Sequence, residues 1–100
     1  MEESFYSMIG GNMMDRNYYI EAYNRRWNEC LEEAKRENAK DISESATYIF
    51  EESCNAKEVV GYYLINHGED SLNDWKSNTN GIKMSSQDLE VDRILTELFK

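Results

Sequence analysis

The sequence predicts an all-α fold, a compact single-domain bundle of four to five short helices. Three observations support this class. Apolar residues recur at intervals of three and four over most of the chain, which is the spacing of one buried helix face. Proline is absent from the 100 residues, so helices can run uninterrupted. Short polar residues of the kind that cap helix N-termini precede the apolar runs.

The chain is expected to divide into an N-terminal arm, residues 1–14, and one helical domain, residues 15–100. The arm carries apolar side chains but is broken by Gly10-Gly11, which disfavours a long helix. Its apolar side chains can fold back onto the core or form an exposed contact surface. Folding back is favoured, because a monomer gains by covering them.

The first long helix is expected to follow Asp15 as N-cap and to reach about Asn38. Its apolar stripe comprises Ile20, Tyr23, Trp27, Cys30, Leu31 and Ala34. Glu29, Glu33 and Glu37 recur every four residues on the polar face. Arginines and lysines are interleaved with them, so some pairing of opposite charges at helical spacing is expected.

Two further N-terminal signals predict the second and third helices. Asp41 and Glu44 have the spacing of a capping box, and Asn55 with Glu58 repeats it. The second helix buries Ile42, Ala46, Ile49 and Phe50. The third ends at His67-Gly68 and is apolar nearly all round, so it is expected to be the central, most buried element. Its β-branched and aromatic content also permits a strand.

The last third of the sequence predicts one short and one longer helix. Ser71 with Asp74 is expected to cap a short turn carrying Leu72 and Trp75, with a turn or loop over residues 78–81. The final helix is expected to start at Ser85 or Ser86, assisted by Asp88. Its buried stripe is Val91, Ile94, Leu95, Leu98 and Phe99.

Composition restricts the possible functions. The net charge of −9 disfavours tight direct binding of nucleic acid, because phosphates are repelled. No apolar run approaches the ~20 residues that span a bilayer, and no signal peptide is recognisable. Cys30 and Cys54 are expected to be reduced core thiols, which favours a cytoplasmic protein without membrane contact.

No residue pattern indicates catalysis, a metal site or a cofactor. Cys30, Cys54 and His67 are possible zinc ligands, but none stands in a C-x-x-C or H-x-x-x-H arrangement. There is no Gly-rich phosphate loop. Among 20 acidic residues, carboxylate pairs arise by chance. We therefore predict that the protein is not an enzyme; catalysis would need a pocket that spacing does not reveal.

The strongest functional signal is acidic charge on the predicted helices. From Glu29 to Glu58, nine Asp/Glu stand against four Lys/Arg, a balance of −5. Carboxylates on adjoining turns and helices can imitate the closely spaced phosphates of DNA. Such a surface attracts proteins that hold nucleic acid with Lys and Arg. The simpler alternative is a solvated polar face without a partner.

A further pattern lies in residues 20–70. An acidic helix is followed by Asp41-Ile42-x-Glu44-x-Ala46 and then by Val59-Val60-x-Tyr62-Tyr63. This succession resembles small acidic helical phage proteins such as the Ocr-type anti-restriction DNA mimics. The resemblance implies a phage-type inhibitor in the host cytoplasm that binds a basic nucleic-acid-binding surface of a host defence protein, a restriction enzyme or a CRISPR effector. Because the chain keeps eleven basic residues, the DNA mimicry would be partial.

Two hypotheses follow for the binding residues. For the inhibitor, the predicted contacts are Glu29, Glu33, Glu37, Glu44, Glu51, Glu52 and Glu58. The alternative is a helical protein-interaction module, such as an immunity protein or a dimeric regulator subunit, that binds through apolar contacts. In that case the exposed tyrosines and the Met-rich arm, Met8 to Met14, would bind the partner, and a homodimer is possible.

Overall fold

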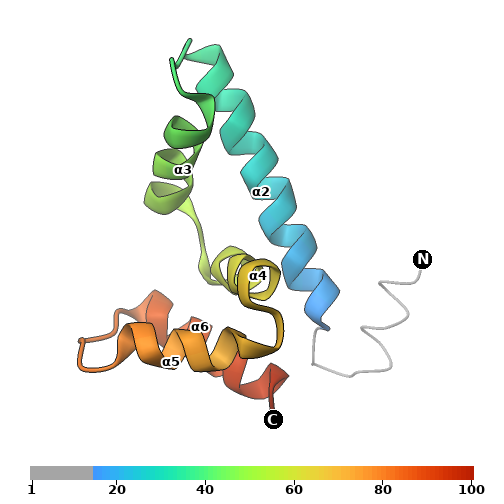
Figure 1. Cartoon of the computed structure of the whole chain (residues 1–100), viewed down its shortest axis with the longest axis vertical. Helices are drawn as coiled ribbons and strands as arrows, with labels where there is room; N and C mark the ends of the chain where they lie inside the picture. The colour runs from blue at the N-terminus through green and yellow to red at the C-terminus, as the bar shows by residue number, and fades with distance from the viewer. Residues whose placement is uncertain (1–14) are drawn as a thin grey trace.

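A computed structural model describes residues 15–100 of the chain. It contains α2 (Arg16–Arg36), α3 (Ile42–Ser53), α4 (Ala56–His67), the 3-10 turn η1 (Gly68–Asp70), α5 (Ser71–Thr79) and α6 (Ser86–Leu98) (Figure 1). The all-α prediction is confirmed. No strand occurs in residues 15–100, so the strand alternative for the third helix is wrong. The predicted arm, residues 1–14, lies outside the described residues, so the structure tests neither the folded-back nor the exposed arrangement of it.

Helix α4 lies at the centre of the arrangement. It packs against α2 on one side and against α5 and α6 on the other, whereas α3 packs mainly against α2. Figure 1 shows α2 and α3 running side by side in opposite directions, with α3 and the α5–α6 pair on different flanks of α4. The central position predicted for the third helix is confirmed.

Four of the predicted caps define the helix starts. Each cap side chain accepts a hydrogen bond from the backbone N–H three residues on, and these caps are Asp15, Asp41, Asn55 and Ser85. Glu58 and Asp88 complete capping boxes by accepting from the backbone N–H of Asn55 and Ser85. These bonds satisfy donors that the first turn of a helix leaves without an intrahelical partner.

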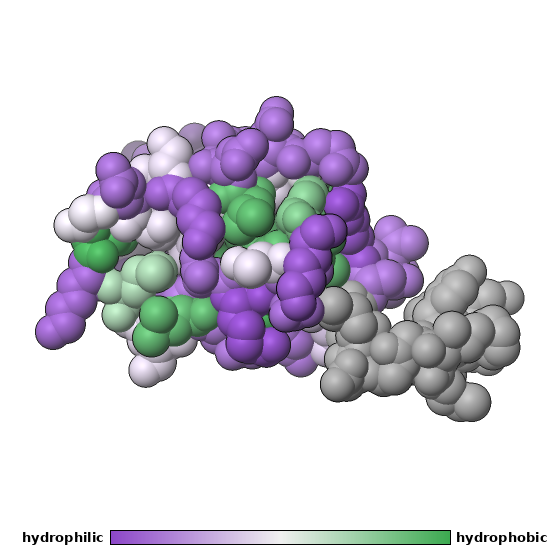
Figure 2. Space-filling view, turned by 90° about the horizontal axis from the view of Figure 1, so that it is seen from below, coloured by the Kyte–Doolittle hydropathy of each residue, from purple (hydrophilic) through white to green (hydrophobic). Residues whose placement is uncertain are grey.

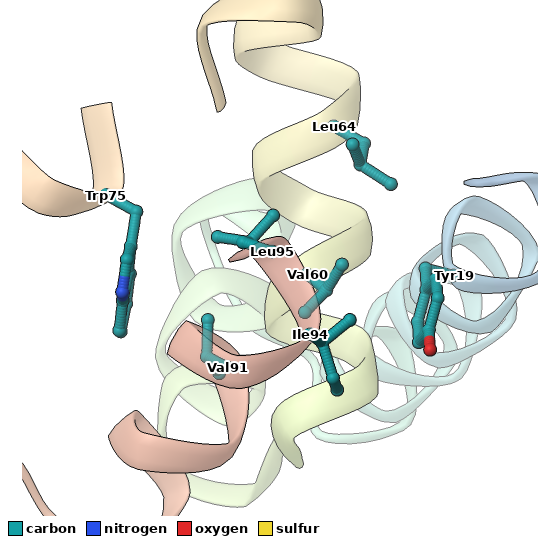
Figure 3. Close-up of a cluster of buried hydrophobic side chains, with 7 residues drawn as sticks. All are labelled: Tyr19, Val60, Leu64, Trp75, Val91, Ile94 and Leu95. Atoms are coloured by element: carbon teal, nitrogen blue, oxygen red, sulfur yellow. The ribbon is translucent and has the colours of Figure 1, made fainter. Parts of the chain in front are cut away.

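The core has two parts. The larger cluster lies between α2, α4, α5 and α6 and consists of Tyr19, Val60, Leu64, Trp75, Val91, Ile94 and Leu95 (Figure 3). The smaller cluster lies between α2 and α3 and consists of Cys30, Ala34, Ala46 and Phe50. Helix α2 contributes to both clusters and therefore connects the two halves of the molecule.

Helix α4 is not buried all round. Val60, Gly61 and Leu64 are buried, but the side chains of Tyr62 and Ile65 are 41% and 45% exposed. The prediction that this helix is the most buried element was therefore too broad. The neighbouring helices leave Tyr62 and Ile65 uncovered, so part of the apolar surface of α4 is open to solvent.

Ser71 does not cap α5 through its side chain. Its buried hydroxyl lies 2.9 Å from the Tyr63 carbonyl oxygen and 2.7 Å from that of Gly68, which share its one proton, while the Asp74 carboxylate contacts Nδ1 of His67. The predicted Ser71–Asp74 cap is therefore wrong. Because η1 follows α4 directly, Ser71 lies against the end of α4 and its hydroxyl binds the carbonyl groups there. The helix also runs to Thr79, further than the predicted turn allowed.

Replacing Ser71 with alanine is expected to lower the free energy of unfolding by about 1–2 kcal/mol, because buried carbonyl groups lose a donor. Urea denaturation followed by circular dichroism measures this change. Ser77→Ala, an exposed position in the same helix, serves as the control and should change stability by less than about 0.5 kcal/mol. Equal effects for the two variants would show that the Ser71 hydrogen bonds contribute nothing specific.

Candidate binding groove

A row of aromatic side chains connects the two core clusters. The row runs through Trp27, Phe50, Tyr23, Tyr62, Tyr63 and Trp75. The Tyr23 and Tyr62 ring centroids lie 5.9 Å apart, and those of Tyr63 and Trp75 lie 5.6 Å apart at an interplanar angle of 86°. Edge-to-face pairs at such distances are favourable beyond the area they bury. The rings therefore form a rigid platform.

These six rings line one groove. It has a volume of about 410 Å³ and lies where α2, α3 and α4 approach the middle of α5 and the start of α6. Pockets for small ligands commonly have volumes of about 300–1,000 Å³. The groove is therefore large enough to admit a side chain of a partner.

Charged side chains of one sign line the same groove. Glu51 of α3 and Asp88 of α6 belong to its wall, and no Lys or Arg occurs among the described residues that line it. Asp88 Oδ2 accepts from the Ser85 backbone N–H, whereas Glu51 forms no ion pair with any residue of 15–100. The groove therefore has an aromatic lining and carboxylates at its edge.

Hydrogen bonds fix the walls of the groove. Gln87 Nε2 donates to the Cys54 carbonyl oxygen at 2.9 Å and thereby ties the start of α6 to the end of α3. Trp75 Nε1 donates to Asp92 Oδ1 at 2.9 Å. Burial, and secondarily the neighbouring Tyr62, raises the pKa of Tyr23 above its ordinary value. Tyr23 therefore remains a neutral phenol at physiological pH.

The acidic residues predicted from the sequence fall in different environments. Glu29 Oε1 accepts from Arg26 at 3.0 Å, and this bond is the main reason why the pKa of Arg26 is raised. Glu29 also borders a shallow surface with Arg25 and Arg36. Glu58 is half-buried and is part of the α4 capping box. These two carboxylates are therefore already engaged within the protein.

The other predicted carboxylates are not ion-paired within residues 15–100. They are Glu33, Glu37, Glu44, Glu51 and Glu52. Glu33 is half-buried, and Glu37 lies at the C-terminal end of α2. The three on α3 are exposed. The array expected from the sequence is thus divided between a mixed surface on α2 and a uniformly acidic α3.

Helix α3 presents its carboxylates on more than one side. At about 100° per residue, Glu44 and Glu51 lie on nearly the same face, two turns apart. Glu52 lies about a quarter turn away from Glu51 and does not line the groove. Tyr48 lies between them and is 66% exposed. The outer surface of α3 thus combines three carboxylates with one accessible aromatic ring.

The two cysteines are free thiols. Cys30 lies in the core as predicted, whereas Cys54 is only partly buried and lines the groove. Burial is the main cause that raises the pKa of both thiols, so both stay protonated and weakly nucleophilic at neutral pH. In residues 15–100, no three His, Cys, Asp or Glu side chains come together as a metal site.

The groove was not among the predictions from the sequence. Its lining residues come from five helices. Of the contacts predicted for the inhibitor only Glu51 lines it, whereas the exposed Tyr62 is of the kind expected for the apolar interaction module. The Tyr62-Tyr63 pair was the available signal, since neighbouring side chains of a helix point about 100° apart and the two rings therefore face different surroundings. Tyr62 is exposed, and Tyr63 packs against Trp75.

No family model matches the chain, and searches of curated proteins and of solved structures found no similar protein. None of the helices in residues 15–100 has the length and apolar character needed to cross a membrane.

Proposed function

We propose that the protein binds a cationic surface of a partner protein through α3. The observation that carries this proposal is the charge of that helix. Helix α3 contains Glu44, Glu51 and Glu52 and, alone among the described α-helices, has no Lys or Arg. None of these three carboxylates has an ion-pair partner within residues 15–100.

The contrast with the other helices explains why α3 is the favoured surface. Helix α2 carries five basic and four acidic residues, and its Glu32 pairs with Lys35. On α6, Glu90 pairs with Arg93. A paired carboxylate has a weaker field at a distance, whereas unpaired carboxylates of one sign add up and steer a cationic partner.

The class of partner follows from charge and from the sequence resemblance. A protein with net charge −9 repels nucleic acid but attracts proteins that hold it with Lys and Arg. The resemblance to acidic phage proteins narrows this class to a host defence protein, either a restriction enzyme or a CRISPR effector. Because a 12-residue helix is about 18 Å long, its carboxylates would imitate only a short stretch of a DNA strand.

Capture from a bacterial lysate tests this proposal with two charge-matched variants. The first replaces the unpaired Glu44, Glu51 and Glu52 with glutamine. The second replaces the ion-paired Glu32, Glu90 and Glu97 with glutamine. Both raise the net charge by three, and circular dichroism confirms that both fold. Bound proteins are eluted with salt and identified by mass spectrometry.

We expect wild type and the second variant to retain a nucleic-acid-binding protein that the first variant loses. Retention should weaken as salt rises, because exposed charges are screened. If all three proteins retain the same partners, or if retention is indifferent to salt, binding through α3 carboxylates is wrong. This comparison separates a local acidic surface from the effect of total charge.

A second candidate function is a helical interaction module that binds through apolar contacts. The exposed apolar side chains of Ile65, Ile82 and Leu89 favour it. Figure 2 shows hydrophobic residues among hydrophilic ones on the face of the molecule seen from below. Sedimentation equilibrium tests this candidate: a homodimer that persists in high salt and dissociates when Leu89 is replaced with aspartate would support it. A monomer at all salt concentrations would exclude self-association.

A further inference from the structure

We propose that the aromatic groove binds the guanidinium group of an arginine side chain presented by the partner. This inference rests on the proposed function, because it supplies the specific contact for the cationic surface that α3 attracts. It concerns the groove, which shares Glu51 with the acidic surface of α3 but does not include Glu44 or Glu52.

The lining of the groove provides flat faces for such a group. Tyr23 and Trp27 are stacked nearly parallel, with ring centroids 6.4 Å apart and an interplanar angle of 9°, and Tyr62, which is 41% exposed, adds a further ring. A planar, weakly hydrated guanidinium stacks on aromatic rings, and the negative face of a ring attracts a cation. The compact ammonium group of lysine is more strongly hydrated than a guanidinium and loses more hydration free energy on entering the groove. Arginine is therefore favoured over lysine.

The carboxylates determine the sign of the ligand. Glu51 lines the groove without an ion-pair partner among residues 15–100, and Asp88 lines it from α6. A guanidinium can donate two parallel hydrogen bonds to one carboxylate, which is the strongest pairing of this type. An anionic ligand would be repelled, because the described lining contains no Lys or Arg.

The position of the groove adds to this attraction. Thr47, Glu51 and Cys54 place the groove along one side of α3, so a cation drawn to that helix arrives beside the aromatic rings. The stacking surface and the carboxylate then act on the same group. An uncharged apolar side chain would leave the Glu51 carboxylate without a partner.

The test uses the full chain and the peptide acetyl-Gly-Arg-Gly-amide. Both tryptophans of the protein, Trp27 and Trp75, line the groove, so selectively excited tryptophan fluorescence reports on this site. Two matched peptides replace arginine with citrulline, which has nearly the same shape without the charge, or with norleucine. We expect a saturable change with the arginine peptide and an affinity weaker by about tenfold or more for both analogues.

Two substitutions locate the site. Glu51→Gln should weaken binding of the arginine peptide by about three- to tenfold, and Tyr62→Leu should weaken it by about threefold. Glu21→Gln removes an exposed carboxylate of α2 that does not line the groove, and it should change the affinity by less than about twofold. Circular dichroism verifies that all three variants fold.

Several results would overturn this inference. Equal binding of the norleucine peptide would show an apolar groove, and equal losses of affinity for Glu51→Gln and Glu21→Gln would show only a general attraction of cations. The absence of a saturable change would show that the groove does not take arginine. If lysate capture still depends on α3 in any of these cases, the proposed function stands while the groove inference fails. If arginine binds but capture does not depend on α3, the proposed function fails instead.

Discussion

Replacing Gly61 with alanine is expected to lower the free energy of unfolding by about 3 kcal/mol or more. A Cβ atom at this position would lie 2.1 Å from the Tyr19 carbonyl oxygen and 2.6 Å from the Tyr23 Cβ. Both neighbours belong to α2, and the nearer one is backbone, so the clash is relieved only if α2 and α4 separate. The higher helix propensity of alanine returns only about 1 kcal/mol.

Urea denaturation and near-ultraviolet circular dichroism measure this effect, since the contact of Tyr23 with Tyr62 bridges the two helices. Gly81→Ala is the matched control. Gly81 has φ of +80° but open space around the added Cβ, so it should cost only about 1–2 kcal/mol of backbone strain. If Gly61→Ala is no more destabilising than Gly81→Ala, the close approach of α2 and α4 is not as described.

Replacing Leu95 with alanine is expected to lower the free energy of unfolding by about 2–5 kcal/mol. Leu95 is fully buried in the larger core cluster, where it lies with Val60 and Val91 between α4 and α6 (Figure 3). Removing the side chain loses the free energy gained when its apolar atoms leave water. It also leaves a cavity that the surrounding residues fill only partly. A domain of this size has about 5–15 kcal/mol of stability, so the loss is severe.

Leu89→Ala provides the comparison within the same helix. Leu89 is 57% exposed, and its truncation should change stability by about 0.5 kcal/mol or less. Thermal unfolding of the two variants side by side distinguishes burial from helix propensity, since the chemical change is the same. Similar losses of stability for both variants would contradict the burial of Leu95 against α4.

The sequence contained enough information for most of the helices. The starts of α2, α3, α4 and α6 depend on Asp15, Asp41, Asn55 and Ser85, each of which acts on backbone groups three residues away. Such local hydrogen bonds can be predicted from the spacing of the residues in the sequence. Ser71 and Asp74 have the same residue types and spacing as Ser85 and Asp88. The Ser71 hydroxyl nevertheless binds carbonyl groups at the end of α4, a contact that depends on how α4 and α5 are joined.

The candidate site was less predictable, because it depends on which side of each helix faces its neighbours. The number of acidic residues was evident, but the pairing of Glu29 with Arg26 depends on side-chain placement. The groove is also set by the crossing of α2 and α4 at Gly61. Nothing in the spacing of aromatic residues indicates that Trp27 and Trp75, 48 positions apart, line the same groove.

The salt dependence of binding tests the role of α3 most directly. The dissociation constant of the partner captured from lysate should be measured between about 50 and 300 mM salt for wild type and for the two glutamine variants. We predict that the α3 variant binds about tenfold more weakly at low salt and shows a shallower salt slope, whereas the Glu32, Glu90 and Glu97 variant resembles wild type. Equal losses for the two variants, or a wild-type affinity that does not change with salt, would contradict this account.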